Sequence, residues 1–133
     1  MQISRKSEYA IHSLMILAFN HGEEMSVDEL ATAQDISRTY LAKVMQKLSG
    51  AGLVRASKGF KGGYSLAVSS NKISLATVVA LFEEDKKFYD CKNLKRGCQL
   101  NKNCLINYAF QNAYQKMLAE LDKLHISDLL ESF

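Results

Sequence analysis

The feature that most restricts the fold of this chain is a pair of short helical patterns separated by about three residues. The first pattern starts at Ser26, which has the capping-box spacing with Glu29, and it ends near residues 34–35. The second starts at an N-cap candidate, Ser37, and ends between two glycines. Two short helices at this spacing predict a helix-turn-helix. The apolar stripe of the second helix consists of Leu41, Val44, Met45 and Leu48.

The turn between these helices carries most of the residues typical of the motif. Ala31 supplies the small residue and Ile36 the hydrophobic turn residue. Asp35 stands where a glycine is common, and aspartate can adopt a left-handed backbone conformation at modest cost. The turn therefore departs from the usual pattern at one position only.

A glycine-rich strand pair follows the second helix directly. Residues 53–56 and 64–68 have the pattern of strands, and residues 58–63 connect them. Three glycines in the connection allow positive backbone angles and a close approach to a surface. Lys58 and Lys61 lie at the tip, where they would meet a phosphate backbone or a minor groove. A helix-turn-helix followed by a basic hairpin predicts a winged helix.

Further helical patterns make the predicted fold mainly α, with one small β-hairpin wing. They cover residues 4–20, a segment after Ser74, a long segment after Cys104 and a short one at 127–133. The long helix has an apolar stripe that needs a partner, either a second copy of itself or the first helix of its own chain. The stripes are Tyr9, Ala10, Leu14, Leu17 and Ala18 in the first helix, Leu75, Val78, Val79 and Phe82 in the second, and Ile106, Ala109, Ala113, Met117, Leu121 and Leu124 in the long one.

Length and composition predict one folded domain outside the membrane. With 133 residues, 47% of them hydrophobic and 23% charged, the chain can bury a core and fold alone. No apolar run approaches the ~20 residues that span a bilayer, and the start of the chain does not resemble a signal peptide. We expect a cytoplasmic protein with no membrane partner.

The charge of the chain is strongly segregated, although the net charge is only +3. Residues 36–82 contain seven basic side chains and no acidic one, and residues 91–104 contain four basic side chains and no acidic one. The remainder of the chain is acidic. This segregation indicates a surface that binds a polyanion, the alternative being a solvated basic face without a partner.

All three cysteines lie within fourteen residues, at Cys91, Cys98 and Cys104. A structural disulfide is disfavoured in the cytoplasm, and the C-x6-C-x5-C spacing is wider than structural zinc sites use. Neighbouring lysines and a helix starting at Cys104 favour thiolates. The pattern favours an iron–sulfur cluster, and another metal or thiol-only redox chemistry remain alternatives. A cluster would need a fourth ligand, which the cysteines do not supply.

The segment SRTYLAKVMQKLSGAGLVRASKGFKGGYSLA at 37–67, followed by a three-cysteine loop, closely resembles the bacterial IscR/NsrR-type regulators. These are homodimeric winged-helix transcription factors, many of which sense iron–sulfur status, nitric oxide or redox stress. The resemblance extends from residue 2 to residue 132, and GLVRASKGFKGGYSLA is its most specific part.

The resemblance implies that a helix over about 37–49 enters the major groove of DNA and that the hairpin enters the minor groove. Ala42 replaces a glutamate that some relatives carry, so their sequence preference does not transfer. Lys58 matches a wing position where arginine is common, and lysine lacks the planar fork. The expected DNA-binding residues are Ser37, Arg38, Thr39, Tyr40, Lys43, Lys47, Lys58, Gly59 and Lys61.

For the cluster, the resemblance implies ligation by Cys91, Cys98 and Cys104. The IscR type adds a histidine three residues after the last cysteine, but this chain has Asn107 there. The NsrR type adds an N-terminal carboxylate from the other subunit, and Glu8 occupies the matching position. Glu8 is therefore the expected fourth ligand across the dimer, and His12, one helical turn further, is the second choice.

The hypothesis is a homodimeric regulator, most often a repressor in this family, that binds a palindromic operator in double-stranded DNA. A 2Fe-2S or 4Fe-4S cluster would control its DNA affinity. The alternative is a cluster-free regulator that responds through thiol oxidation, a small ligand or a protein partner. No nucleophile–base pair or phosphate loop supports an enzyme. We assign 1–85 to DNA binding, 86–104 to the cluster and 105–133 to dimerisation, within one compact unit.

Overall fold

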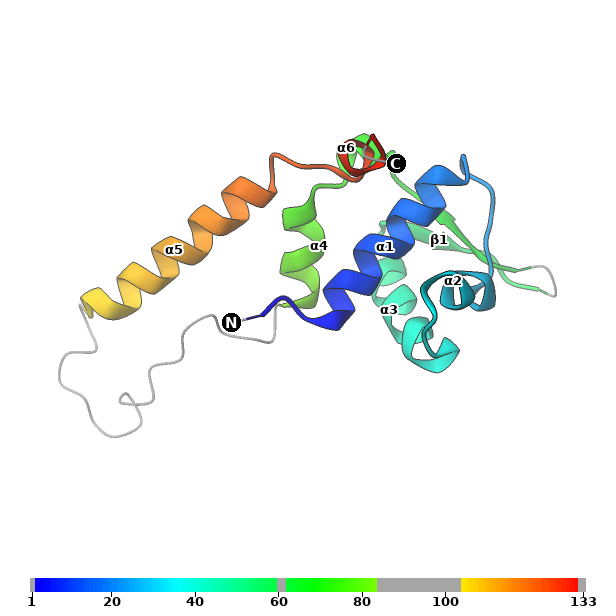
Figure 1. Ribbon diagram of the computed structural model, residues 1–133, viewed down its shortest axis with the longest axis horizontal. Coiled ribbons are helices and arrows are strands. Elements are labelled where there is room, and N and C mark those ends of the chain that lie inside the picture. The colour runs from blue at the N-terminus through cyan, green and yellow to red at the C-terminus, as the bar shows by residue number, and fades with distance from the viewer. Residues whose placement is uncertain (1, 60–61, 84–103, 132–133) are drawn as a thin grey trace.

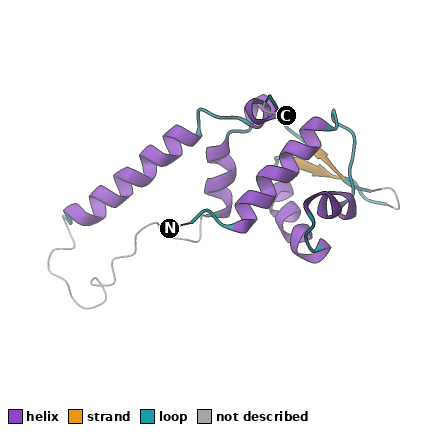
Figure 2. Ribbon diagram, viewed as in Figure 1, coloured by secondary structure: helices purple, strands orange, loops and turns teal. Residues whose placement is uncertain are grey.

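The computed structural model describes residues 2–59, 62–83 and 104–131, and its elements are almost all helical (Figures 1 and 2). A two-stranded antiparallel hairpin, β1–β2, lies at one side of the helical body. The predicted mainly α class with one small hairpin is confirmed. The elements are α1 (Arg5–Phe19), α2 (Val27–Gln34), α3 (Arg38–Gly50), β1 (Val54–Ala56), β2 (Tyr64–Leu66), the 3-10 helix η1 (Ser70–Lys72), α4 (Leu75–Phe82), α5 (Leu105–Leu121) and α6 (Ile126–Leu130).

Helix α1 begins where the sequence places its cap. The Ser4 side chain accepts a hydrogen bond from the backbone N–H of Ser7, so one of the unpaired amides of the first turn is satisfied. Ala10, Leu14 and Leu17 are fully buried, and they recur on one face of the helix. Helix α1 therefore forms one wall of the core.

Helices α2 and α3 form the predicted helix-turn-helix. Ser26 and Glu29 make both hydrogen bonds of a capping box at the start of α2. Asp35 has φ 53° and ψ 49°, so the residue in place of the common glycine adopts the left-handed conformation. All four residues of the predicted stripe of α3 are buried.

The hairpin is attached to the helical body at two places: through α3, which precedes β1, and through the segment just before α2. Strand β2 pairs with β1 in the register Val54↔Leu66, Arg55↔Ser65 and Ala56↔Tyr64. Tyr64 also forms an antiparallel bridge with Met25, just before α2. A Cβ on Gly63 would lie 2.7 Å from the Met25 carbonyl oxygen, so only glycine fits this crossing without a shift. The wing therefore has a fixed root.

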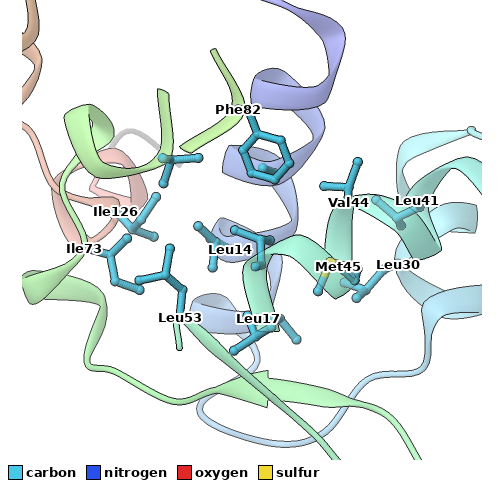
Figure 3. Close-up of a cluster of buried hydrophobic side chains, with 14 of the residues drawn as sticks. Leu14, Leu17, Leu30, Leu41, Val44, Met45, Leu53, Ile73, Phe82 and Ile126 are labelled. Carbon is cyan, nitrogen blue, oxygen red and sulfur yellow. The ribbon is translucent and has the colours of Figure 1, made fainter. Parts of the chain in front are cut away.

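The core extends to the last helix of the chain. Ile126 is fully buried beside Ile73, and its N–H donates to the Ile73 carbonyl at 2.9 Å (Figure 3). Leu75 N–H donates to the carbonyl of Leu124, and Ser74 forms an isolated bridge with His125. Part of the segment that we assigned to dimerisation therefore completes the core of the DNA-binding half. The boundary between those two segments does not separate two cores.

Helix α5 projects from the body, and its amino end lies at the side away from α6 (Figure 1). None of its residues is buried, and Ile106 is 57% exposed. The helix contacts α4 within its own chain. Most of the predicted apolar stripe therefore has no cover in one subunit.

Candidate functional site

Helix α3 presents its amino end as an exposed, positively charged surface. The Ser37 side chain accepts a hydrogen bond of 3.4 Å from the N–H of Tyr40 and so caps the helix. Arg38, Thr39 and Lys43 are exposed. Three residues of the predicted DNA-binding set are thus exposed in the amino-terminal half of α3.

Two other predicted residues of α3 are turned toward the body instead. The Tyr40 ring lies edge-on against the Tyr9 ring of α1, with centroids 5.7 Å apart. The Lys47 ammonium lies 5.5 Å from the centroid of the Phe82 ring of α4. These contacts fix α3 against α1 and α4. A role of either residue at DNA stays a prediction.

The described part of the wing tip is exposed and built on a glycine conformation. Gly59 has φ 118°, which a residue with a side chain rarely adopts, and Lys58 beside it is exposed. Below the tip, Ser57 N–H donates to the Gly63 carbonyl at 2.8 Å, and Gly63 N–H donates to Ser57 Oγ at 3.1 Å. Lys61, the other predicted residue of the tip, lies outside the described residues.

The structure adds two acidic residues that sequence reasoning missed. Asp28 of α2 lies 2.8 Å from Arg38 of α3, between its Oδ1 and the arginine Nε. Glu83, at the end of α4, is only 7% exposed, and its Oε1 accepts from Ser4 N–H and Ser7 Oγ. Each acid has an acidic neighbour in the sequence, Glu29 or Glu84, so no local signal set it apart.

A groove of about 840 Å³ runs along the outer side of α1. Glu8 and His12, the two candidates for the fourth ligand, both line it, one turn apart on α1. Arg5 Nη1 donates to Glu8 Oε2 at 2.8 Å, and this hydrogen bond raises the pKa of Arg5. The rest of the groove is mostly apolar, with Tyr9, Met15, Ile16, Phe19, Met25 and Leu130 among its lining residues.

Cys104 is the N-cap residue of α5, partly exposed and not in a disulfide. It therefore lies at the amino end of a helix, as the sequence predicted. Cys91 and Cys98 lie outside the described residues. Within residues 2–59, 62–83 and 104–131, no three potential ligands gather at one point. Glu8 on α1 and Cys104 at the start of α5 are both partly exposed.

A family model described as "Rrf2: Iron-dependent Transcriptional regulator" matches residues 3–132. The chain belongs to the Rrf2 family. Among curated relatives, an HTH-type transcriptional regulator of Aquifex aeolicus (strain VF5) is 30% identical over 132 residues, covering 98% of this chain and 92% of the relative. The protein aau3 of Rhizobium meliloti (strain 1021) is 31% identical, covering 99% of this chain and 86% of the relative.

Two solved structures have the same fold as this chain. The structure of T. potens IscR superimposes with a TM-score of 0.75 at 24% identity, covering 99% of this chain and 88% of that one. The oxidised form of Staphylococcus aureus CymR gives 0.72 at 26% identity, covering 98% and 97%. At 24% identity, the likeness to the IscR structure shows the winged-helix fold alone.

Membership of the Rrf2 family makes this chain a DNA-binding transcriptional regulator and not an enzyme. The winged helix observed in the structure is the element through which such proteins contact DNA. In the described part of the chain, no helix has the length and hydrophobicity that crossing a membrane requires.

Proposed function

We propose that this Rrf2 regulator is a homodimer that binds a palindromic operator under the control of an iron–sulfur cluster. The observation that carries the proposal is the mostly exposed α5, which begins at a free cysteine and has no buried residue in one subunit.

Dimerisation is supported by two apolar surfaces of matching length. Helix α5 has 17 residues and is about 25 Å long, and α1, with 15 residues, is about 22 Å long. Ile106 on α5 is 57% exposed, and Phe19 in the groove along α1 is 67% exposed. Contiguous apolar surfaces of this kind indicate a protein partner. A second copy covers both, because each subunit offers one helix and one groove.

DNA binding by such a dimer uses two copies of α3 and two wings. In a two-fold dimer the recognition helices enter successive major grooves, about one helical turn apart, which requires a palindromic site. Arg38, Thr39 and Lys43 lie at the exposed end of α3, and Lys58 lies at the wing. Their positive charge supplies phosphate affinity that falls as the salt concentration rises.

The donor set fits an iron–sulfur cluster at the amino end of α5. Cysteine sulfur is the ligand that such clusters take, and Cys104 is free and partly exposed at the amino end of α5. Cys91 and Cys98 complete the three cysteines of the sequence. Glu8 lines the α1 groove, which we propose receives α5 of the partner subunit. It is therefore the proposed fourth ligand, with His12 as second choice.

When bound, the cluster would supply reversible redox and nitric-oxide reactivity. Cys104 of one subunit and Glu8 on α1 of the other would then hold the same cluster. Helix α1 packs against α3, so a change at the amino end of α1 would alter how α3 is presented to DNA. Residues 86–104 would hold the cluster and 105–133 the dimer, with α6 also completing the core.

An anaerobic preparation from iron-replete cells tests this proposal. We expect a coloured protein with iron and inorganic sulfide in near-equal amounts, a dimeric mass and salt-dependent binding to DNA. The Cys104→Ser variant is expected to lose the colour and keep its fold. A colourless, iron-free wild-type protein would contradict the cluster, and a monomeric mass would contradict the dimer.

A second candidate is a cluster-free regulator that responds to thiol oxidation. The oxidised form of CymR, at 26% identity, shares the fold, and Cys104 is a partly exposed free thiol. Such a protein is expected to be colourless and to change its DNA affinity reversibly with peroxide and dithiothreitol. Loss of that response in Cys104→Ser, in an iron-free protein, would favour this candidate.

A further inference from the structure

Asp28 and Arg38 form an ion pair where α2, α3 and the wing meet. Arg38 Nε lies 2.8 Å from Asp28 Oδ1. The two residues also line a cavity of about 320 Å³, together with Gly59 and Tyr64 of the wing region. The pair therefore joins the first residue of α3 to the second residue of α2, on the side from which the wing extends.

Stability alone does not account for this pair. The side chains of Arg38 and Asp28 are 67% and 68% exposed, and ion pairs this exposed contribute little to folding. Arginine is also poorly placed in the first turn of a helix, where the helix dipole disfavours a cation. The first turn of α3 contains no acid of its own, so Asp28 supplies the compensating charge from α2.

The atom that Asp28 approaches determines what the rest of the guanidinium can do. Pairing at Nε occupies the edge of the planar guanidinium that Nε–H shares with one Nη group, and it leaves uncovered the end of the fork, where each Nη group has one outward N–H bond. Two parallel N–H bonds from such a fork match the O6 and N7 acceptors of guanine in the major groove. An arginine already held by a carboxylate also loses less side-chain entropy when it binds.

We propose that Asp28 is a positioning residue for sequence readout: it holds Arg38 through Nε so that the two Nη groups face one guanine in each operator half-site. The inference rests on the proposed DNA-binding surface and deepens it, because it assigns a specific base to one residue of α3. Asp28 itself touches no base.

The same ion pair could instead open when DNA binds, with Arg38 moving to a phosphate. Asp28 would then compete with DNA, and removing its charge would strengthen binding to every sequence alike. Readout and competition therefore predict opposite results for the same variant.

The experiment selects sequences from a pool of double-stranded DNA with a randomised core. The full-length wild type, Asp28→Asn, Arg38→Ala and the double variant are compared at one salt concentration, and each is first checked for an unchanged thermal midpoint. Asp122→Asn is the matched control, because it removes the same charge from an exposed residue at the end of α5. Binding to each single-base variant of the selected site is then measured.

We expect Asp28→Asn and Arg38→Ala to lose about tenfold preference for the same guanine, with little change at other positions. The double variant should lose no more than Arg38→Ala, and Asp122→Asn should match the wild type. Unchanged preferences in Asp28→Asn or in Arg38→Ala, or a uniform gain in affinity, would overturn the inference alone. A wild type that selects no sequence would overturn the proposed operator binding as well.

Discussion

Glu83 accepts a hydrogen bond of 2.7 Å from the backbone N–H of Ser4, which ties the carboxyl end of α4 to the amino end of α1. The same Oε1 atom accepts a second hydrogen bond, of 2.8 Å, from the buried hydroxyl of Ser7. The ammonium of Lys47, in α3, lies over the ring of the neighbouring Phe82. Phe82, the last residue of α4, and its C-cap Glu83 thus contact α3 and α1, shortly before the segment that contains Cys91.

Replacing Glu83 tests the importance of this contact for folding. We expect Glu83→Ala to lower the free energy of unfolding by about 2–4 kcal/mol, because the buried Ser7 hydroxyl and the partly buried Ser4 N–H lose their acceptor. Glu83→Gln keeps one acceptor oxygen and should lose less. Urea denaturation followed by circular dichroism measures both, and Glu24→Gln, at an exposed loop residue, is the control. A Glu83→Ala midpoint equal to that of the wild type would contradict the expectation.

The root of the wing depends on a glycine. A Cβ at position 63 would lie 2.7 Å from the Met25 carbonyl oxygen, so Gly63→Ala must push the strand away from Met25. We expect a loss of about 1–3 kcal/mol and faster hydrogen exchange at the Met25 amide, which donates to Tyr64. Gly50→Ala is the matched control, since nothing lies within 4 Å of its added Cβ. Equal stability of the two variants would contradict this prediction.

If a second subunit covers α5, a charge placed on the apolar stripe of this helix should shift the protein from dimer to monomer. Ile106→Asp places a charge on the apolar stripe and is expected to weaken the dimer at least tenfold, whereas Gln111→Asp, on another face of α5, should not. Sedimentation equilibrium over a range of protein concentrations distinguishes the two. The prediction fails if Ile106→Asp keeps the dissociation constant of the wild type.

A mixed dimer of two defective variants can test whether Glu8 is a ligand of the cluster in the other subunit. One chain carries Glu8→Ala and the other Cys104→Ser, with different affinity tags, so that mixed dimers can be isolated. If Glu8 ligates the partner's cluster, the mixed dimer has one complete site, and half of the wild-type cluster should survive in air. Each variant alone should lose its cluster faster than the wild type.

The same experiment separates the competing assignments. If Glu8 acted within its own chain, the mixed dimer would contain no complete site, and its cluster would decay as in the Glu8→Ala dimer. An unchanged visible spectrum and stability in Glu8→Ala would exclude Glu8, and the same pair of measurements on His12→Ala would then test the second choice.

Local patterns in the sequence were sufficient to predict most of the elements. The N-cap side chains of Ser4, Ser26, Ser37 and Ser74 each bind a backbone N–H three residues later. Such short-range contacts can be predicted from the local sequence. Asp35 could likewise be recognised as a residue able to turn left-handed. The predicted strands were longer than β1 and β2 by one or two residues, at ends where pairing stops.

Contacts between distant parts of the chain were not predictable in this way. Glu83 looked like the first of a run of solvated acids after α4, but it folds back onto Ser4, 79 positions earlier. Lys47 is predicted to bind DNA phosphate, and nothing in the sequence indicated that its ammonium also lies over the ring of Phe82. The chemistry of each side chain permits both environments, and only the packing of three helices decides between them.

The burial of Ile126 has a consequence for the order in which the protein matures on the ribosome. Synthesis proceeds from the amino end, so α1–α4 emerge while the place that Ile126 fills against Ile73 is still vacant. That place is filled only after both the cysteine segment and α5 have been translated. A nascent winged helix is therefore incompletely packed until the residues that would bind the cluster and the second subunit are already present.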